Sequence, residues 1–234
     1  MRRLLFPLAL VAVTLALGVL AVPAGYLDRR RRWCRYVAPA WCRALLRAAG
    51  VRVEVEGWDR VPRDGPCVLV ANHQSNLDIL VLGSVLPHET LWLAKRELFR
   101  IPVFGTTLRA VGYLPVDRGR HDEARASIDA AARAVVSGSP VILFPEGTRS
   151  RDGRLLPFKL GFVHLAAASG APVVPLVLRG TAELWPKGTW APRPGVVRVR
   201  VLDPVRVEGI DTPEERRAHA EALRARMARA LGEP

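Results

Sequence analysis

Residues 67–78 are Cys-Val-Leu-Val-Ala-Asn-His-Gln-Ser-Asn-Leu-Asp, and this stretch gives the strongest indication of the fold. Its first five residues form an apolar run of strand length, and the Asn, Gln and Ser residues after them favour a turn. The apolar segment Ile79-Leu80-Val81-Leu82 then fits the start of a helix. A strand, a turn and a helix in this order predict one unit of an α/β fold.

His73 and Asp78 are the two residues of this stretch that suit catalysis. On a continuous α-helix, residues five apart are rotated by about 500°, which is roughly 140° away from a shared face. The two side chains therefore meet only if His73 ends the strand and Asp78 lies near the start of the helix. Catalytic groups usually lie at such strand ends. The alternative is an ordinary turn, with Asp78 as an N-cap and His73 merely exposed.

A second polar block, Phe144-Pro145-Glu146-Gly147-Thr148-Arg149, follows the apolar run of residues 141–144. Pro145 ends this predicted strand, and Gly147 allows backbone amides to approach a ligand. Arg149 offers a planar fork of donors that matches an oxyanion, although a solvated surface arginine is the alternative. If both strands are parallel, both loops open on one edge of the sheet. A base and an anion clamp at one edge indicate an enzyme that activates a hydroxyl of an anionic substrate.

Four blocks in order make the chain resemble a known family, the 1-acylglycerol-3-phosphate O-acyltransferases (lysophosphatidic acid acyltransferases), within the glycerolipid acyltransferases. The resemblance covers about residues 51 to 180. The blocks are Asn72-His73-Gln74-Ser75-Asn76-Leu77-Asp78; Lys95-Arg96-Glu97-Leu98 with Pro102, Gly105 and residues 112–119; residues 144–150 with Phe158, Lys159 and Gly161; and Val173-Val174-Pro175-Leu176-Val177. Asp203-Pro204 departs from the family, in which many members have glycine before this proline, but it lies far from the predicted chemistry.

The resemblance implies a reaction and a role for each site residue. His73 is expected to act as general base on a hydroxyl of a lysophospholipid acceptor, and Asp78 to orient the imidazole. The hydroxyl attacks the thioester of acyl-CoA or acyl carrier protein, so an acyl carrier is a co-substrate and neither a cofactor nor a metal is expected. Glu146 cannot pair with phosphate and is expected to orient an arginine or to accept from a hydroxyl. The residues expected to bind the acceptor are Lys95, Arg118, Glu146, Gly147, Thr148 and Arg149.

The three cysteines, Cys34, Cys42 and Cys67, show no Cys-x-x-Cys spacing, which argues against a zinc site. Their odd number also argues against a disulfide framework and fits a reducing compartment. Cys67 lies near His73, so a cysteine nucleophile is an alternative; its position inside the predicted strand favours a buried apolar role. The chain contains no Gly-x-Gly-x-x-Gly or Walker-type loop, so a nucleotide cofactor is not indicated.

The formal net charge is +13, and of 35 basic residues only Lys95, Lys159 and Lys187 are lysine, which leaves 32 arginines. Such a surplus favours anionic partners. The sequence shows no nucleic-acid-binding module and no basic platform rich in aromatic residues, so anionic membrane lipid is the expected partner rather than nucleic acid. Genomic composition is an alternative source of part of the arginine content.

The N-terminal segment supports a membrane location. Residues 4–22 carry no charge, and as a helix they would span about 28 Å of a hydrocarbon core about 30 Å thick. More arginines follow this segment, including Arg29 to Arg32, than precede it, which predicts a catalytic domain on the cytoplasmic face of the inner membrane. A cleaved signal peptide is the alternative, because Val22-Pro23-Ala24 offers small residues for cleavage.

Residues 33–48 show an apolar stripe at helical spacing that includes Trp33 and Trp41. This pattern suits a helix in the headgroup layer, and an amphipathic helix packed on the core is the alternative. Residues 1–50 are therefore predicted to form a helical membrane anchor, and residues 51–234 the catalytic domain.

Beyond Gly50 the pattern predicts a mixed, largely parallel sheet flanked by helices, as the resemblance implies. Residues 185–195, rich in Pro, Gly and Trp, predict an irregular surface loop. The predicted strands are 51–56, 67–71, 91–94, 112–116, 141–144, 173–178 and 196–202, and the predicted helices are 79–85, 122–137, 162–169 and 213–231.

The sequence as a whole predicts a membrane-bound acyltransferase that turns lysophosphatidate into phosphatidate. One alternative keeps the chemistry and changes the acceptor to another lysophospholipid or a lyso-aminolipid. Another alternative is a non-catalytic, arginine-rich membrane-binding protein. The intact pair of motifs argues against the second alternative, because binding alone does not need a base.

Overall fold

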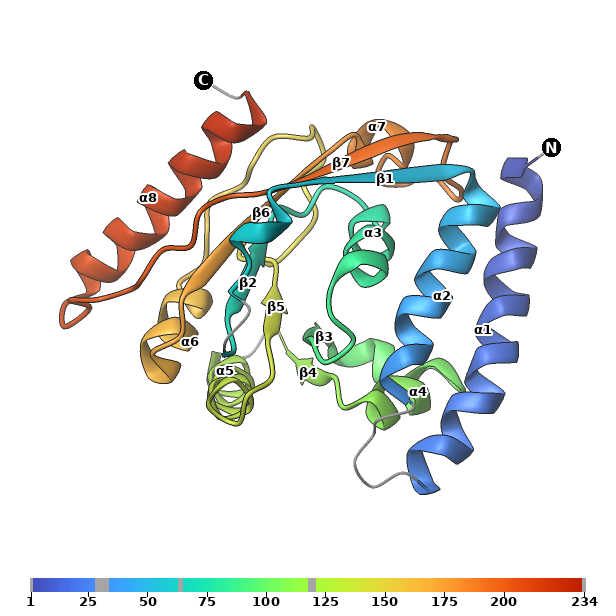
Figure 1. Ribbon diagram of the computed structural model, residues 1–234, viewed down its shortest axis with the longest axis horizontal. Coiled ribbons are helices and arrows are strands. Elements are labelled where there is room, and N and C mark those ends of the chain that lie inside the picture. Colours follow the sequence, from blue (N-terminus) through green and yellow to red (C-terminus); the bar gives the residue numbers. More distant parts are fainter. Residues whose placement is uncertain (1, 28–33, 63–64, 118–120, 233–234) are drawn as a thin grey trace.

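The computed structural model of the chain describes residues 2–27, 34–62, 65–117 and 121–232. Its centre is a sheet of seven strands (Figure 1). These are β1 (Val51–Glu56), β2 (Val68–Ala71), β3 (Leu91–Lys95), β4 (Leu114–Val116), β5 (Val141–Leu143), β6 (Val173–Arg179) and β7 (Gly195–Val201), in the spatial order β1-β7-β6-β2-β5-β3-β4. Every neighbouring pair is parallel except β6 and β7, which confirms the predicted mixed, largely parallel sheet.

The helices are α1 (Arg2–Leu27), α2 (Cys34–Ala49), α3 (Leu77–Val85), α4 (Phe104–Val111), α5 (His121–Val136), α6 (Gly161–Ser169), α7 (Thr181–Leu184) and α8 (Pro213–Leu231), with two short 3₁₀ turns, η1 (Trp58–Arg60) and η2 (Arg96–Arg100). Helices α3, α5 and α6 lie in crossovers between parallel strands, as such connections require. Strand β7 runs antiparallel to β6 because only α7 and a loop connect the two.

The sheet separates two apolar layers (Figure 1). On one face, Leu45 of α2 and Leu82 of α3 are fully buried against the strands. On the other face, Phe162 of α6 and Met227 of α8 fill the second layer. The central strand β2 is buried along its whole length, which explains why its sequence is a continuous apolar run.

Helix α1 packs along α2 and α4 (Figure 1). Its Phe6 is buried and meets the Trp185 ring edge-on at a centroid distance of 5.3 Å. The indole of Trp41 in α2 donates to the Thr14 hydroxyl of α1 over 2.9 Å. The prediction that residues 185–195 form a surface loop is thus wrong for Trp185, because α1 covers this side chain.

Helix α2 buries Cys42, Leu45 and Leu46 in the first apolar layer. This packing supports the alternative of an amphipathic helix on the core for this part of residues 33–48. Across the described ranges, no helix combines the length and the hydropathy that crossing a bilayer requires, so the predicted transmembrane span at residues 4–22 is not confirmed. Arg29 to Arg32 and Trp33, on which the membrane predictions also drew, lie outside the described residues.

Helix α4 is absent from the predicted elements, and β4 is shorter than the predicted strand 112–116. Gly112 has a φ of 85° and ends α4, which moves the start of the strand to Leu114. Before α4, Val103 has a φ of 62° and a ψ of −58°, and the Phe104 amide donates to the Pro102 carbonyl over 2.6 Å. This tight three-residue turn is rare for a β-branched residue and turns the chain into α4.

Candidate active site

The loop between β2 and α3 brings His73 and Asp78 together. His73 follows β2 by two residues, and Asp78 lies in the first turn of α3, as the spacing argument required. The ring Nδ1 and the Asp78 Oδ2 are 2.8 Å apart, and both side chains are buried. Oδ2 also accepts from the backbone amides of Gln74 and Ser75, each over 2.7 Å. One carboxylate oxygen therefore holds both the imidazole and the turn that carries it.

This contact determines which nitrogen of His73 is available for chemistry. A carboxylate only accepts hydrogen bonds, so Nδ1 carries a proton, and in the neutral imidazole Nε2 then presents its lone pair. The ring stacks on Phe144 at a centroid distance of 4.0 Å and an interplanar angle of 14°. Within the described part of the chain, Nε2 makes no hydrogen bond. His73 is thus oriented to accept a proton through Nε2.

Asn72 and Ser75 attach the same loop to the rest of the sheet. The Asn72 side chain donates to the Leu178 carbonyl over 3.0 Å and accepts from the Leu178 amide over 2.8 Å. The Ser75 hydroxyl donates to the Trp185 carbonyl over 2.7 Å. These residues predicted a turn from sequence, but their buried polar groups form tertiary hydrogen bonds that hold the loop still.

The second polar block follows β5, which neighbours β2, and it contacts His73 directly. Glu146 is buried, and its Oε1 accepts from the His73 amide over 2.6 Å while its Oε2 accepts from the Leu156 amide over 3.0 Å. The Ser150 amide donates to the His73 carbonyl over 2.9 Å. The two motifs are therefore joined through the backbone of the candidate base, and Glu146 holds that junction.

We expect Glu146→Ala to lower the free energy of unfolding by about 3 kcal/mol, because the buried His73 amide and the partly buried Leu156 amide lose their acceptor. kcat should fall as well, since the His73 backbone loses one of its anchors. Urea unfolding and steady-state kinetics test this, with Glu221→Ala on α8 as the control because its carboxylate is exposed. Equal urea midpoints for Glu146→Ala and the wild type would contradict the role of this carboxylate in the loop.

Gly147 and Arg149 form the part of the loop suited to an anion. Gly147 has a φ of 70°, a conformation that favours glycine, and a Cβ there would stand 2.9 Å from Cε of Lys159. Thr148 is exposed and Arg149 is half-buried. The Arg149 carbonyl accepts from Nζ of Lys187 over 2.9 Å. Two lysine side chains thus accompany the arginine at this loop.

Lys95 ends β3, the strand on the other side of β5, and its ammonium lies 3.0 Å from the Glu97 carboxylate. Arg118 lies outside the described residues. The structure therefore places Lys95, His73 and the 146–149 loop at the carboxyl ends of three adjacent parallel strands. This is the edge of the sheet where ligands bind in open α/β folds.

Lys159 and Lys187 are absent from the binding residues predicted from sequence, although a signal was present. All three lysines of a chain with 35 basic residues lie around this site: Lys95 at a strand end, Lys159 against Gly147, and Lys187 on the Arg149 carbonyl. A compact ammonium on a flexible stem suits places where the planar arginine fork does not fit. The rarity of lysine in this composition marks the site.

The acyltransferase family model matches residues 52–179, more than half of the chain and all the residues of the two motifs. The chain belongs to the acyltransferase family. It is 38% identical over 180 residues to 1-acyl-sn-glycerol-3-phosphate acyltransferase alpha of Mus musculus, covering 76% of this chain and 63% of the relative. It is 36% identical over 160 residues to 1-acyl-sn-glycerol-3-phosphate acyltransferase of Limnanthes douglasii, covering 68% of this chain and 56% of the relative. The chain thus spans a little over half the length of such plant relatives.

Among solved structures, this chain is similar to the 1-acyl-sn-glycerophosphate (LPA) acyltransferase PlsC from Thermotoga maritima. The TM-score is 0.81 at 29% identity, with 100% of this chain and 99% of that chain covered. The sheet flanked by helices is therefore the fold of a known acyltransferase, as the sequence resemblance implied.

Cys67 lies immediately before β2 and is buried at 2% exposure. Burial raises the pKa of its thiol to about 11, and burial likewise raises the pKa of Cys42 to about 12. Only the thiolate is a nucleophile, so a thiol with a raised pKa is protonated at neutral pH. These surroundings argue against Cys67 as a catalytic nucleophile.

We expect Cys67→Ala to retain activity within about threefold, because the thiol serves as a small apolar group. At pH 7.5 the native Cys67 should resist N-ethylmaleimide, whereas urea-unfolded chain should react rapidly as the pKa returns to its ordinary value. Mass spectrometry of the modified peptides separates Cys67 from Cys34 and Cys42. Rapid labelling of native Cys67 that abolishes activity would restore the cysteine mechanism.

Proposed function

We propose that this acyltransferase transfers a fatty acyl group from an acyl thioester to the free hydroxyl of 1-acylglycerol-3-phosphate and so forms phosphatidate. The observation that carries the proposal is the buried His73–Asp78 pair, joined through Glu146 to a loop with Arg149. A base for a hydroxyl and a cationic loop for a phosphate are the two groups that this acceptor needs. The names of the mouse and plant relatives support the same acceptor.

In the proposed reaction, Nε2 of His73 takes the proton from the acceptor hydroxyl as its oxygen attacks the thioester carbonyl carbon. A new carbon–oxygen bond forms, the carbon–sulfur bond breaks, and the imidazolium returns the proton to the leaving sulfur. Asp78 keeps Nδ1 protonated and stabilises the positive imidazolium through the 2.8 Å contact. The acyl carrier, CoA or acyl carrier protein, is a co-substrate, and no further cofactor enters these steps.

The acceptor phosphate is proposed to bind at the 146–149 loop. Arg149 presents a guanidinium whose paired donors match phosphate oxygens, and the positive φ of Gly147 opens the loop to close approach. The ammonium groups of Lys159 and Lys187 add positive charge beside the loop. Lys95, Thr148 and Arg118 are proposed as further contacts, with Arg118 outside the described residues.

The decisive experiment assays purified protein with acyl-CoA and acyl carrier protein against a panel of lysolipids. We expect the highest kcat/KM with lysophosphatidate and at least tenfold less with acceptors that lack a phosphate monoester. Stronger activity on another lysophospholipid or a lyso-aminolipid would assign the enzyme to that acceptor. Lipid binding without transfer to any acceptor would favour a non-catalytic membrane-binding protein.

We also propose that the protein works at the cytoplasmic face of the inner membrane with α1 resting on the bilayer. Five apolar side chains recur along one side of α1 at helical spacing and remain exposed, from Leu15 at 49% to Leu8 at 68%. Such a stripe suits the boundary between headgroups and acyl chains, and the net charge of +13 favours anionic lipid. The exposed members are Leu5, Leu8, Val11, Leu15 and Val19.

Replacing Leu8 with glutamate should weaken binding to anionic vesicles by about tenfold, because one buried leucine contributes about 1.5–3 kcal/mol. Vesicle sedimentation measures this, and Val136→Glu on α5 is the control because Val136 is equally exposed at 68%. If both variants bind vesicles as the wild type does, α1 is not the membrane contact.

A further inference from the structure

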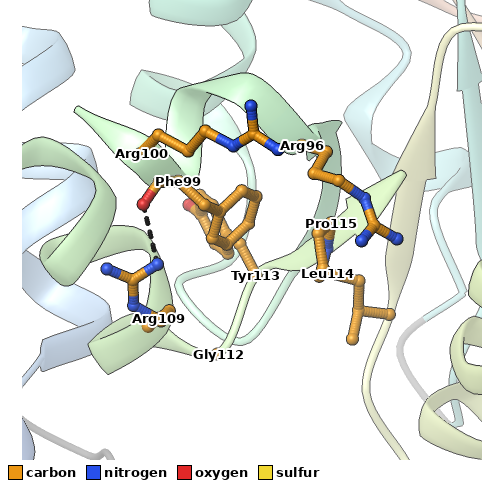
Figure 2. Close-up of a pocket in the computed structure, with 8 residues that line it drawn as sticks. All are labelled: Arg96, Phe99, Arg100, Arg109, Gly112, Tyr113, Leu114 and Pro115. Atoms are coloured by element: carbon orange, nitrogen blue, oxygen red, sulfur yellow. Dashed lines mark hydrogen bonds between the residues drawn. The ribbon is translucent and has the colours of Figure 1, made fainter. Parts of the chain in front are cut away.

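A pocket of about 550 Å³ lies between η2, the end of α4 and the edge strand β4, and the predicted site residues that the structure describes do not line it. Three arginines, Arg96, Arg100 and Arg109, surround an apolar floor that includes Phe99 and Tyr113 (Figure 2). Figure 2 shows the Arg100 side chain extended across one side of the pocket and Arg109 on another. Guanidinium groups around an apolar floor suit a ligand with an anionic group on a less polar body.

The packing of α4 against η2 builds one wall of this pocket. Gly105 allows the close approach, because a Cβ there would stand 2.3 Å from the Phe99 carbonyl oxygen. The same carbonyl accepts from Nη1 of Arg109 over 2.7 Å (Figure 2). One end of the Arg109 fork is thereby held, and its remaining donors are oriented by the backbone.

Arg96 forms the opposite wall, and two carboxylates fix the position of its guanidinium. Its Nη2 forms an ion pair with Glu123, and its Nε lies 4.0 Å from the Asp117 carboxylate. Arg100 differs, because across the described residues its guanidinium forms no ion pair. Two braced guanidiniums and one unpaired guanidinium leave a surplus of positive charge at the pocket.

The described residues that line this pocket include three arginines and no carboxylate, and Glu123 and Asp117 contact Arg96 from outside the lining. A second depression of about 640 Å³, beside the catalytic loop, is also rich in arginine. Its Arg151, Arg154 and Arg179 are accompanied by Asp152 and Glu183, so its charges are mixed. The first pocket is therefore the better site for an anion.

A row of aromatic rings joins the pocket to the catalytic histidine. Tyr113 lies 6.3 Å from Trp92, Trp92 lies 6.3 Å from Phe144, and Phe144 lies 4.0 Å from His73, all between ring centroids. The arginine pocket is thus separated from the candidate base by two intervening side chains. A ligand that uses both places must carry its anion far from its reacting atom.

We propose that the Arg96–Arg100–Arg109 pocket binds the phosphate of the donor's phosphopantetheine arm, and this inference rests on the proposed acyl transfer. The arm carries a phosphate at one end and the thioester sulfur at the other, with a long, weakly polar chain between them. CoA and acyl carrier protein both present this arm. A pocket set apart from His73 by two rings suits an arm that carries its phosphate and its sulfur at opposite ends.

The acceptor does not fit the same pocket. In 1-acylglycerol-3-phosphate the reacting hydroxyl and the phosphate stand on adjacent carbons, so the phosphate must bind close to His73. The Arg149 loop meets this requirement, because it is joined to the His73 backbone through Glu146. Trp92 and Phe144 separate the arginine pocket from His73. The structure therefore supplies two anion sites for two phosphates at different distances from the reaction.

The test compares an acyl-phosphopantetheine donor with the matching acyl-pantetheine, which lacks only the phosphate. In the wild type, kcat/KM should be at least tenfold higher with the phosphorylated donor, as a charge-assisted contact requires. Arg100→Ala should reduce this preference about threefold, and Arg100→Ala with Arg109→Ala should abolish it. Arg217→Ala on α8, which removes an exposed arginine far from the pocket, should retain it.

The KM for lysophosphatidate should stay within about twofold in every variant, and the rate with acyl-pantetheine should be unchanged. The KM values for acyl-CoA and for acyl carrier protein should rise together, since both carry the phosphate. A rise with one of these donors alone, or an undiminished preference for the phosphorylated fragment in the double variant, overturns the proposal. Absence of transfer by the wild type with any donor is a separate result, which refutes the proposed function itself.

Discussion

His73→Ala is expected to lower kcat by roughly 10³-fold, within the range that removal of a general base produces. The variant loses the only ring that Asp78 orients, so no group takes the proton as the acceptor hydroxyl attacks the thioester. The backbone contacts of His73 to Glu146 and Ser150 involve its amide and carbonyl, and alanine keeps both. Product formation from labelled acyl-CoA and lysophosphatidate measures the loss.

His164→Ala is the matched control for this variant, because His164 is an exposed histidine on α6, under the opposite face of the sheet. It should retain the wild-type rate. Thermal unfolding of His73→Ala should resemble that of the wild type, which separates lost chemistry from lost structure. Activity of His73→Ala within tenfold of the wild type would show that the imidazole is not the base.

Asp78→Ala is expected to lower kcat about as much as His73→Ala does. It should also destabilise the fold by about 3–5 kcal/mol. Oδ2 of this fully buried carboxylate accepts from His73 Nδ1 and from the amides of Gln74 and Ser75. Alanine leaves all three donors buried without an acceptor. Urea unfolding followed by tryptophan fluorescence measures the stability, and single-turnover kinetics measure the rate.

Asp78→Asn separates the geometry of the loop from the charge of the carboxylate. The amide oxygen can take the place of Oδ2 and accept from the same three donors, so the turn and the imidazole keep their positions. Only the negative charge beside the imidazolium is lost, and kcat should fall about 10–100-fold, less than in Asp78→Ala. If the two variants lose kcat equally, charge and not geometry dominates at Asp78.

Elements with strong local signals follow the predictions closely. β1 (Val51–Glu56) and α8 (Pro213–Leu231) have the predicted ends. In β1 the strict alternation of apolar and polar residues determines the strand. In α8 the Thr212 hydroxyl and the Glu215 carboxylate form a capping box at the start, and Gly232 with a φ of 74° ends the helix. Each of these signals acts within a few residues of the chain.

Features that depend on contacts with segments distant in the sequence were not predicted. Helix α4 contains Gly105 and two threonines, which favour helix weakly, and it forms where the glycine lets it pack on η2. Trp185 belongs to a segment whose composition predicts a surface loop, yet Phe6 of α1 covers it from far away in the sequence. Local pattern carries no information about which remote side chain supplies such cover.

The contacts of the candidate site also divide into local ones, which the sequence predicted, and long-range ones, which it did not. The spacing of His73 and Asp78 after an apolar strand was enough to predict their contact, because the turn between them is local. The hydrogen bond from the His73 amide to Glu146 links residues 73 positions apart, and Lys187 reaches the Arg149 carbonyl across 38 positions. Neither contact follows from spacing. Only the rarity of lysine in the composition pointed toward Lys187.

Local sequence was enough to predict the α/β class, the contact of His73 with Asp78, and the glycine-containing loop that carries Arg149, because each arises within one strand–turn–helix unit. The tertiary structure alone decided the strand order β1-β7-β6-β2-β5-β3-β4, which sets β2 beside β5 and so joins the two motifs. It also decided the arginine pocket beside η2, whose residues are ordinary surface arginines in the sequence. The physical reason is that strand neighbours and pocket walls form between segments far apart in the chain, where burial and shape, rather than local pattern, select the partners.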